Sequence, residues 1–361
     1  MSTNTFHMPL GPVHVALEEP VYFNITCDGE SVKSVELTSG HVHRGMEQLA
    51  LRRNLVKNVT LTERVCSLCS NSHSFTYSMV VENALGLAIP DRARYLRVVA
   101  EEVKRIASHL FNMAIQAHLT GFATFFMQIM ETREIMQDVK ETVYGNRMNL
   151  ASNCIGGVKF DLGQDKLDYL LKQLDVLEPQ VEEIREIFAT NGTILNRTRG
   201  LGILPPEDAT ALGVTGPVAR GSGLQMDCRK NSPYAAYGEL DFDMITETGC
   251  CAHSRTMVRL NEIFESIKML RQAIAQMPGG AVHAPMPGIP VAEAFAHSEA
   301  PRGEVAYYIR TDGTETPARL KWRVPSYMNW KALSVMMRGA QIADIALVLN
   351  SIDPCVSCTE R

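Results

Sequence analysis

The sequence predicts a mainly α protein of the α+β class, in which a bundle of long helices forms the core and small β-sheet pieces lie near the N-terminus and before the last helix. Apolar residues recur at helical spacing over long stretches, and glycine or proline separates those stretches at a few places. Runs with strand propensity are short. Three or more long helices must bury their apolar faces mainly on one another, which predicts the bundle.

The N-terminal part predicts a β-hairpin. Residues 21–27 (VYFNITC) are rich in β-branched and aromatic side chains, and Asp28-Gly29-Glu30 is a turn signal before the second run at 32–37. Residues 62–87 then carry apolar side chains at helical intervals. We therefore expect a helix over 62–87 that contains Cys69 and His73 on one face.

The centre of the chain predicts further long helices. Pro90-Asp91 opens one at 92–118, and Gly121 breaks it before a second segment that runs to about residue 143. Another amphipathic helix covers 165–190, and we expect Gly192 to help end it. Residues 196–245 are rich in glycine and proline and predict a long loop region, which in a compact domain is usually functional.

The C-terminal third returns to regular structure. A helix is expected over 250–277, and a proline-rich loop follows it. Strands at 303–309 and 318–324 flank a turn at 311–313. The last helix, 330–349, would carry residues 353–361 into the interior.

We expect one domain over residues 1–361. Its parts are an α+β segment (1–60), a helical core (61–195 and 249–350), a loop-rich connector (196–248) and a buried metal-binding C-terminus (351–361).

Composition excludes several classes of protein. A net charge of −5 gives no reason to expect nucleic-acid binding. Residues 1–10 have no basic or apolar signal-peptide segment, so the nine cysteines indicate metal or redox chemistry before disulfides. The most apolar run, 110–130, contains too many polar residues for a membrane span and predicts a buried helix.

Two CxxC pairs are the most informative feature of the sequence: Cys66 with Cys69, and Cys355 with Cys358. Almost the whole chain separates them, whereas the pairs of a zinc ribbon lie about 15–20 residues apart. Structural zinc, an iron–sulfur cluster and a catalytic transition metal all suit such thiolates. A thioredoxin-like role is weaker, because no βαβ pattern surrounds either pair.

These motifs resemble those of nickel–iron hydrogenase large subunits. The run RVCSLC at 64–69, followed by His73, is similar to the family pattern RxCGxCxxxH, with Ser67 in place of glycine. The run DPCVSCTER at 353–361 is similar to DPCxxCxxH or DPCxxCxxR. Arg361 at its end is typical of the membrane-bound, energy-converting branch.

The resemblance covers almost the whole chain. Segments 11–14, 43–47, 227–234 and 300–304 also resemble the 49-kDa subunit of respiratory complex I, a relative that has lost the cysteines. The rival interpretation is therefore a docking subunit of a complex I-like quinone oxidoreductase, with structural metal or none. Retention of all four cysteines favours the hydrogenase.

The resemblance implies a nickel–iron centre. Cys66 and Cys355 would bind nickel terminally, and Cys69 and Cys358 would bridge nickel to an iron that carries CO and cyanide. Thiolates suit both metals. No iron–sulfur cluster is expected in this chain. The remaining cysteines, which match no ligand motif, are expected to be buried small hydrophobic residues: Cys27, Cys154, Cys228, Cys250 and Cys251.

The resemblance also implies catalytic residues. Glu19 corresponds to a glutamate beside a bridging cysteine and would relay protons, although Glu18 is adjacent and either could be a surface carboxylate. Pro301 and Arg302 correspond to a segment that places a guanidinium over the metal and cyanide. Asp353 would hold Arg302 by a bidentate contact, unless these are an ordinary surface arginine and helix-end aspartate.

Two further residues are candidates near the C-terminus. His73 would hydrogen-bond a cysteine sulfur, or would be an ordinary core histidine. Glu47 corresponds to a ligand of a magnesium or iron ion. Because Arg361 replaces the usual histidine, a Glu47–Arg361 salt bridge is the alternative.

The implied activity is reversible reduction of protons to H2. Expected partners are a small subunit with a 4Fe-4S cluster, a ferredoxin-like subunit and integral membrane ion-translocating subunits, which would hold this chain at the cytoplasmic face of the membrane. Family members are often cleaved just after the position of Arg361, so we expect a processed chain or a gene without the extension.

Overall fold

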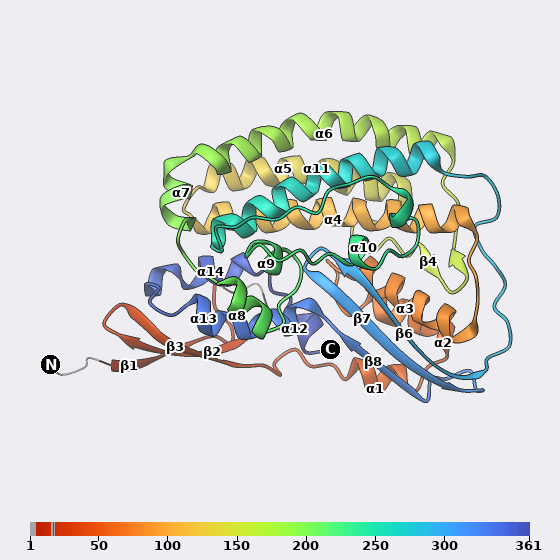
Figure 1. Ribbon diagram of the computed structural model, residues 1–361, viewed down its shortest axis with the longest axis horizontal. Coiled ribbons are helices and arrows are strands. Elements are labelled where there is room, and N and C mark those ends of the chain that lie inside the picture. Colours follow the sequence, from red (N-terminus) through yellow and green to blue (C-terminus); the bar gives the residue numbers. More distant parts are fainter. Residues whose placement is uncertain (1–4, 16, 18) are drawn as a thin grey trace.

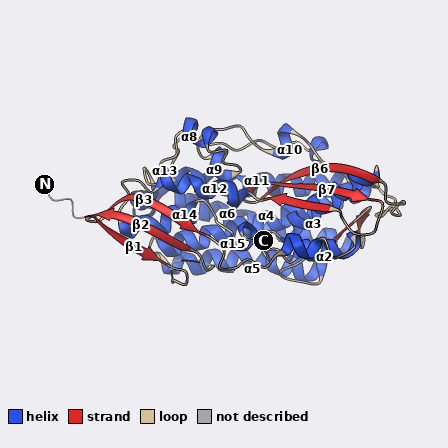
Figure 2. Cartoon of the chain, turned by 90° about the horizontal axis from the view of Figure 1, so that it is seen from below, coloured by secondary structure: helices blue, strands red, loops and turns tan. Residues whose placement is uncertain are grey.

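The computed structural model describes residues 5–15, 17 and 19–361. Four long helices form one layer, and two small sheets with the shorter helices form the other (Figure 1). The two sheets lie at opposite ends of the elongated molecule, and the C-terminus lies between them (Figure 2). The mainly α fold with small sheets is confirmed.

The helical layer is a four-helix bundle. In it α4 and α6 each pack against both α5 and α11. Leucine, valine, isoleucine and phenylalanine of α6 repeat every three or four residues from Leu167 to Phe188 and are buried in the bundle core. The bounds match the expected helices closely: α4 Asp91–Leu119, α5 Ala123–Tyr144, α6 Gln164–Thr190 and α11 Ala252–Gln276.

Glycine ends one of these helices and begins another. Gly121 has φ +88° between α4 and α5, a conformation that other residues rarely adopt, so the expected break is confirmed. Gly192 instead begins α7 (Gly192–Thr198). The expectation that it ends α6 is therefore wrong: Asn191 separates the two helices and caps α7 with its side chain.

The N-terminal sheet contains the expected hairpin. Strands β2 (Tyr22–Asp28) and β3 (Ser31–Thr38) are antiparallel, and β1 (Thr5–Leu10), which the sequence did not predict, pairs with the other edge of β2. Phe23, Ile25 and Cys27 alternate on the buried face of β2. They pack on the C-terminal helices and so connect this sheet to the end of the chain that carries the second cysteine pair.

The second sheet has the antiparallel order β6-β7-β8, with β7 (Gly303–Asp312) and β8 (Arg319–Arg323) close to prediction. Strand β6 (Val291–Ala300), which the sequence did not predict, follows the expected proline-rich loop. Its alternating alanine and glutamate have low strand propensity, but full pairing with β7 overrides that preference.

The expected helix over 62–87 is interrupted. Helix α1 (Met46–Ala50) leads to α2 (Leu55–Glu63), and α3 (Ser70–Leu85) begins only after Cys69. Residues 64–69 form a loop, so the cysteine pair lies between two helices rather than on one of them. The two-residue strands β4 (Asn153–Cys154) and β5 (Gly157–Val158) lie beside α3 and α4.

The single helix expected over 330–349 is wrong. Gly339 has φ +80°, and its N–H and the carbonyl of Ala340 both bond Val32 in β3, which removes this backbone from a helix. The chain forms short elements: α12 Pro325–Asn329, η2 Trp330–Ala332, α13 Leu333–Met336, η3 Ile342–Asp344, α14 Ile345–Ser351 and α15 Val356–Thr359.

The predicted loop region also contains short helices: α8 Pro206–Ala211, α9 Pro217–Arg220, α10 Cys228–Asn231 and η1 Tyr237–Glu239. The backbone of this connector lies directly against the backbone of the β6–β7 turn. A Cβ on Gly216 would lie 2.4 Å from the carbonyl oxygen of Arg302, and one on Gly303 would lie 2.8 Å from the Gly216 nitrogen. Only glycines allow this approach, which fixes the turn that carries Arg302.

None of the helices in the described part of the chain is long and apolar enough to cross a membrane. The proposed division into N-terminal part, helical core, connector and C-terminus stays a prediction.

Candidate metal centre

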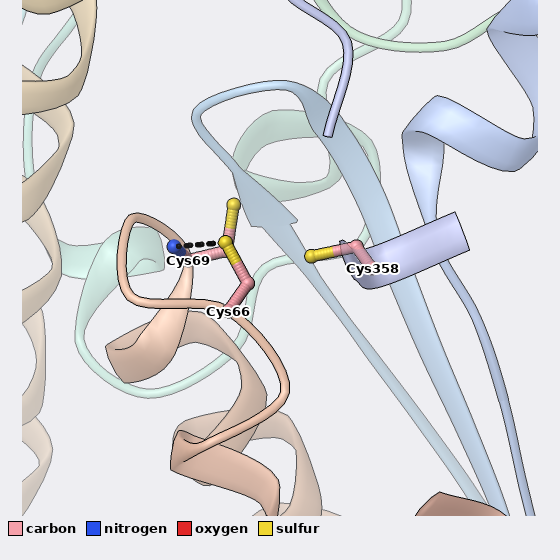
Figure 3. Close-up of side chains that lie close together, drawn as sticks. All are labelled: Cys66, Cys69 and Cys358. Carbon is pink, nitrogen blue, oxygen red and sulfur yellow. Dashed lines mark hydrogen bonds between the residues drawn. The ribbon is translucent and has the colours of Figure 1, made fainter. Parts of the chain in front are cut away.

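The two CxxC pairs meet in the interior. Sγ atoms of Cys66, Cys69 and Cys358 all lie within 4.8 Å of one another, with Cys358 facing the other two from a separate element (Figure 3). Cys355 completes the group, with its Sγ 3.2 Å from that of Cys66. All four side chains are buried. One pair comes from the loop before α3 and the other from both ends of α15.

Polar contacts hold the C-terminal pair inside the protein. Arg259 of α11 donates to the carbonyl of Ser351 at 2.9 Å, and Ser326 accepts from the Cys355 N–H at 3.0 Å. Trp330 donates to Thr359 Oγ1 at 2.9 Å. Residues 351–361 are buried except for Pro354, Ser357 and Arg361, which are half-buried.

The four cysteine sulfurs change one another's pKa values. Hydrogen bonds from Cys358 and Cys66 lower the pKa of Cys355 to about 6, while contacts with the other three sulfurs raise the pKa of Cys358 well above its usual value. Four thiolates this close would repel one another unless a cation lay between them. A soft divalent metal supplies that charge, so this donor set fits a nickel–iron centre.

His73 contacts the cysteine cluster from α3. Its Nε2 lies 3.4 Å from Cys358 Sγ, and its Nδ1 lies 2.7 Å from the hydroxyl of Tyr307 in β7. Burial lowers the pKa of His73 to about 4, so the ring is neutral at pH 7. If Tyr307 donates to Nδ1, the single ring proton is on Nε2 and is donated to the sulfur.

Tyr307→Phe should lower the free energy of unfolding by about 1–3 kcal/mol, because it leaves a buried ring nitrogen without a partner. Urea denaturation measures this change. Tyr327→Phe removes the same hydroxyl from an exposed ring and is the matched control. Equal stability of both variants would show that the His73–Tyr307 bond contributes nothing.

Arg302 and Asp353 form a buried ion pair beside the cysteines. The Arg302 Nη2 donates to Asp353 Oδ1 at 2.7 Å, its Nε donates to the Asp353 carbonyl at 2.9 Å, and its Nη1 lies 3.4 Å from Cys69 Sγ. The expected bidentate contact with the carboxylate is wrong, because Arg302 bonds one carboxylate oxygen and the backbone carbonyl of Asp353 instead. Asp353 has φ +52°, which turns its backbone carbonyl to the guanidinium, and its Oδ2 has no partner.

Pro301 lies in the buried β6–β7 turn next to Arg302, and its predicted contact with the cofactor stays a prediction.

The carboxylate of Glu19 contacts the backbone of the C-terminal cysteine motif. Its Oε2 accepts from the N–H groups of Val356 at 2.7 Å and Ser357 at 3.0 Å, and its Oε1 accepts from the Ser357 hydroxyl. The side chain lines a cavity of about 400 Å³ together with Cys66 and Cys355. It therefore lies beside the cluster, and its role as a relay stays a prediction. Glu18 lies outside the described residues.

Glu47 forms the salt bridge that was the alternative to an ion site. Its Oε1 accepts from Arg361 Nε at 3.0 Å, and its Oε2 contacts Lys321. Hydrogen bonds from these two cations lower the pKa of Glu47 against the opposing effect of burial. Two cationic groups on one carboxylate oppose a metal ion there, so the geometry favours the salt bridge over the Glu47 ion site.

Sequence reasoning missed three buried polar residues of this region. Lys104 donates to the carbonyl of Ser67 within the first CxxC loop at 2.9 Å, and Ser108 accepts from Arg302 at 3.1 Å. Both lie on one face of α4. Arg133 of α5 lines the same cavity as Glu19. Lys104 and Ser108 at i and i+4 in an apolar helix are the signal that could have found the first two.

The other cysteines are only partly as expected. Cys27 and Cys251 are buried. Cys154, Cys228 and Cys250 are half-buried, so the expectation of burial is wrong for these three because they lie on short surface elements rather than in the core.

Two family profiles match the chain. The nickel-dependent hydrogenase family matches residues 44–165, which contain the first cysteine pair. The family described as the 49-kDa subunit of the respiratory-chain NADH dehydrogenase matches 120–289 and 285–361. The chain belongs to this joint family of nickel–iron hydrogenase large subunits and complex I 49-kDa subunits.

Several members of this family are similar to the chain over its full length. A carbon monoxide-induced hydrogenase of Rhodospirillum rubrum is 57% identical over 99% of this chain and 100% of its own. The alpha subunit of a membrane-bound hydrogenase of Pyrococcus furiosus is 36% identical over 98% of this chain and 87% of its own. An NADH-quinone oxidoreductase component of Dehalococcoides mccartyi is 33% identical over 100% of both.

Proposed function

We propose that this chain is the catalytic large subunit of an energy-converting nickel–iron hydrogenase. The observation that carries the proposal is the meeting of four buried cysteines, from opposite ends of the chain, beside a buried arginine and a neutral histidine. The similarity to a carbon monoxide-induced hydrogenase supports it. The reaction is the reversible combination of two protons and two electrons to H2.

Cys66, Cys69, Cys355 and Cys358 would hold the nickel–iron centre. When bound, this centre would transfer the two electrons and provide the site at which H2 is split or formed. Arg302 places its positive charge at Cys69 and is held in place by Asp353. With Tyr307 donating to its Nδ1, His73 would stabilise negative charge on Cys358 by donating its Nε2 proton. Burial of His73, Arg302 and Asp353 keeps bulk water away from these three side chains.

Glu19 would move protons between the cluster and the cavity. The carboxylate lies on the backbone between the two C-terminal cysteines and lines the cavity that Cys355 also lines. A carboxylate at such a position can accept a proton from the site and pass it on. Its hydrogen bonds to Val356 and Ser357 fix its orientation.

The partners follow from the family and from the buried centre. Electrons would arrive from reduced ferredoxin through a ferredoxin-like subunit and a small subunit with a 4Fe-4S cluster. Integral membrane ion-translocating subunits would hold the chain at the cytoplasmic face of the membrane. Relatives in the same family include a subunit of a membrane-bound hydrogenase, which supports this assembly.

The test is isotope exchange between H2 and D⁺ by the purified complex. We expect exchange without any added electron donor, because it needs only the metal centre and a proton relay. The rival function, a docking subunit of a quinone oxidoreductase, is favoured by the match to the 49-kDa subunit profile. Quinone reduction without H2/D⁺ exchange would establish the rival and overturn the proposal.

A further inference from the structure

A second group of metal-ligand side chains lies away from the four-cysteine centre. The group contains one ligand atom from each of three residues, Cys228, His297 and Glu304, and these three atoms lie within 4.8 Å of one another. The three residues come from α10, β6 and β7, so the fold brings together what the sequence separates. All three are half-buried, which leaves them accessible to an ion.

The cluster faces a cavity lined with further ligand atoms. The cavity has a volume of about 250 Å³, and Asp227 and Glu299 line it along with the three residues. This space can hold an ion and water that completes its coordination. A thiol, an imidazole and a carboxylate form the mixed sulfur, nitrogen and oxygen donor set that Zn²⁺ accepts, commonly with water in the remaining position.

The side chains are already oriented. His297 Nδ1 lies 2.7 Å from Glu304 Oε1, and its Nε2 lies 3.1 Å from the hydroxyl of Ser232. Arg323 contacts the other oxygen of Glu304 and holds that carboxylate in place. Ser232 and Arg323 lie outside the ligand set, and contacts from such residues orient metal ligands in known sites.

We propose that Cys228, His297 and Glu304 form a binding site for a single zinc-type divalent transition-metal ion, separate from the catalytic centre. The ion would join α10 of the connector to both strands of the β6–β7 hairpin. The turn of this hairpin carries Arg302, so metal binding would stabilise the position of the guanidinium beside the cysteines. The site does not depend on the proposed hydrogenase activity.

Cobalt(II) titration of the full-length protein, washed with a chelator, tests the site. A cysteine ligand gives a thiolate-to-cobalt charge-transfer absorption. Because the four-cysteine centre also accepts soft metals, the signal is the difference between the native chain and Cys228→Ser. We expect the native chain to bind one more equivalent of cobalt than this variant and to show the absorption.

The matched control is Cys154→Ser, which removes another half-buried cysteine. This variant should bind cobalt like the native chain. His297→Gln keeps hydrogen-bonding ability and should weaken binding by more than about 100-fold, since loss of a mere supporting group costs about 10–100-fold. His283→Gln, at an exposed histidine elsewhere, should not change the affinity.

Zinc should also raise the thermal midpoint of the native chain more than that of Cys228→Ser, because a ligand that binds only the folded state stabilises it and the variant lacks one of the two sites. Equal cobalt binding by the native chain, Cys228→Ser and His297→Gln would overturn the proposal. If Cys228→Ser failed to fold, as judged by circular dichroism, the comparison of His297→Gln with His283→Gln would decide.

Discussion

Glu19→Gln should lower H2 evolution and H2/D⁺ exchange by about 10²- to 10⁴-fold, the contribution that a positioned acid–base group typically makes. Glutamine keeps the size of the side chain and can still accept hydrogen bonds from Val356 and Ser357, but it cannot titrate. Nickel content should be unchanged. Both activities and the nickel content are measured on the same preparation.

Glu18→Gln changes the adjacent carboxylate and is the control, which should leave exchange nearly unaltered. Full exchange in Glu19→Gln with intact nickel would make the relay assignment wrong. Loss of nickel together with activity would assign Glu19 a different role, that of holding the C-terminal cysteine motif in place.

Arg220→Met should lower the free energy of unfolding by about 3–5 kcal/mol, the cost of removing one partner from a buried ion pair. The Arg220 guanidinium is fully buried and donates to Glu262 at 2.8 Å and Glu299 at 2.7 Å, with Asp227 at 3.7 Å. Methionine fills much of the volume but leaves the buried carboxylates of Glu262 and Glu299 without their guanidinium partner, while Asp227 keeps its ion pair with Arg229. Chemical denaturation monitored by circular dichroism measures the change.

Arg147→Met is the matched control. Arg147 also contacts three carboxylates, those of Glu134, Asp138 and Glu141, but on the surface, where water and salt screen the charges. We expect a much smaller change for this variant. A similar loss at both positions would mean that burial of the Arg220 network has no special energetic importance.

The parts of the fold that the sequence predicted correctly have local signals. Asp28-Gly29 marks the β2–β3 hairpin, and the regular repeat from Leu167 to Phe188 marks α6. The metal-binding cysteines could be named because their spacing is specific to few chemistries. Their meeting in one buried group could be inferred only through the resemblance to a family.

The parts of the fold that the sequence did not predict correctly depend on contacts between distant segments. Strand β6 forms because β7 pairs with it, although alanine and glutamate alone do not favour a strand. The expected last helix is broken where Gly339 bonds Val32, which lies near the other end of the chain. The buried partners of Arg220 come from α11, β6 and the connector, and no local pattern pairs them.

Elemental analysis of the purified protein tests the central claim most directly. If the four cysteines Cys66, Cys69, Cys355 and Cys358 hold a nickel–iron centre, the chain should contain one nickel and one iron, and Cys355→Ser should lose the nickel. Stoichiometric zinc at these four cysteines with no nickel would contradict the account.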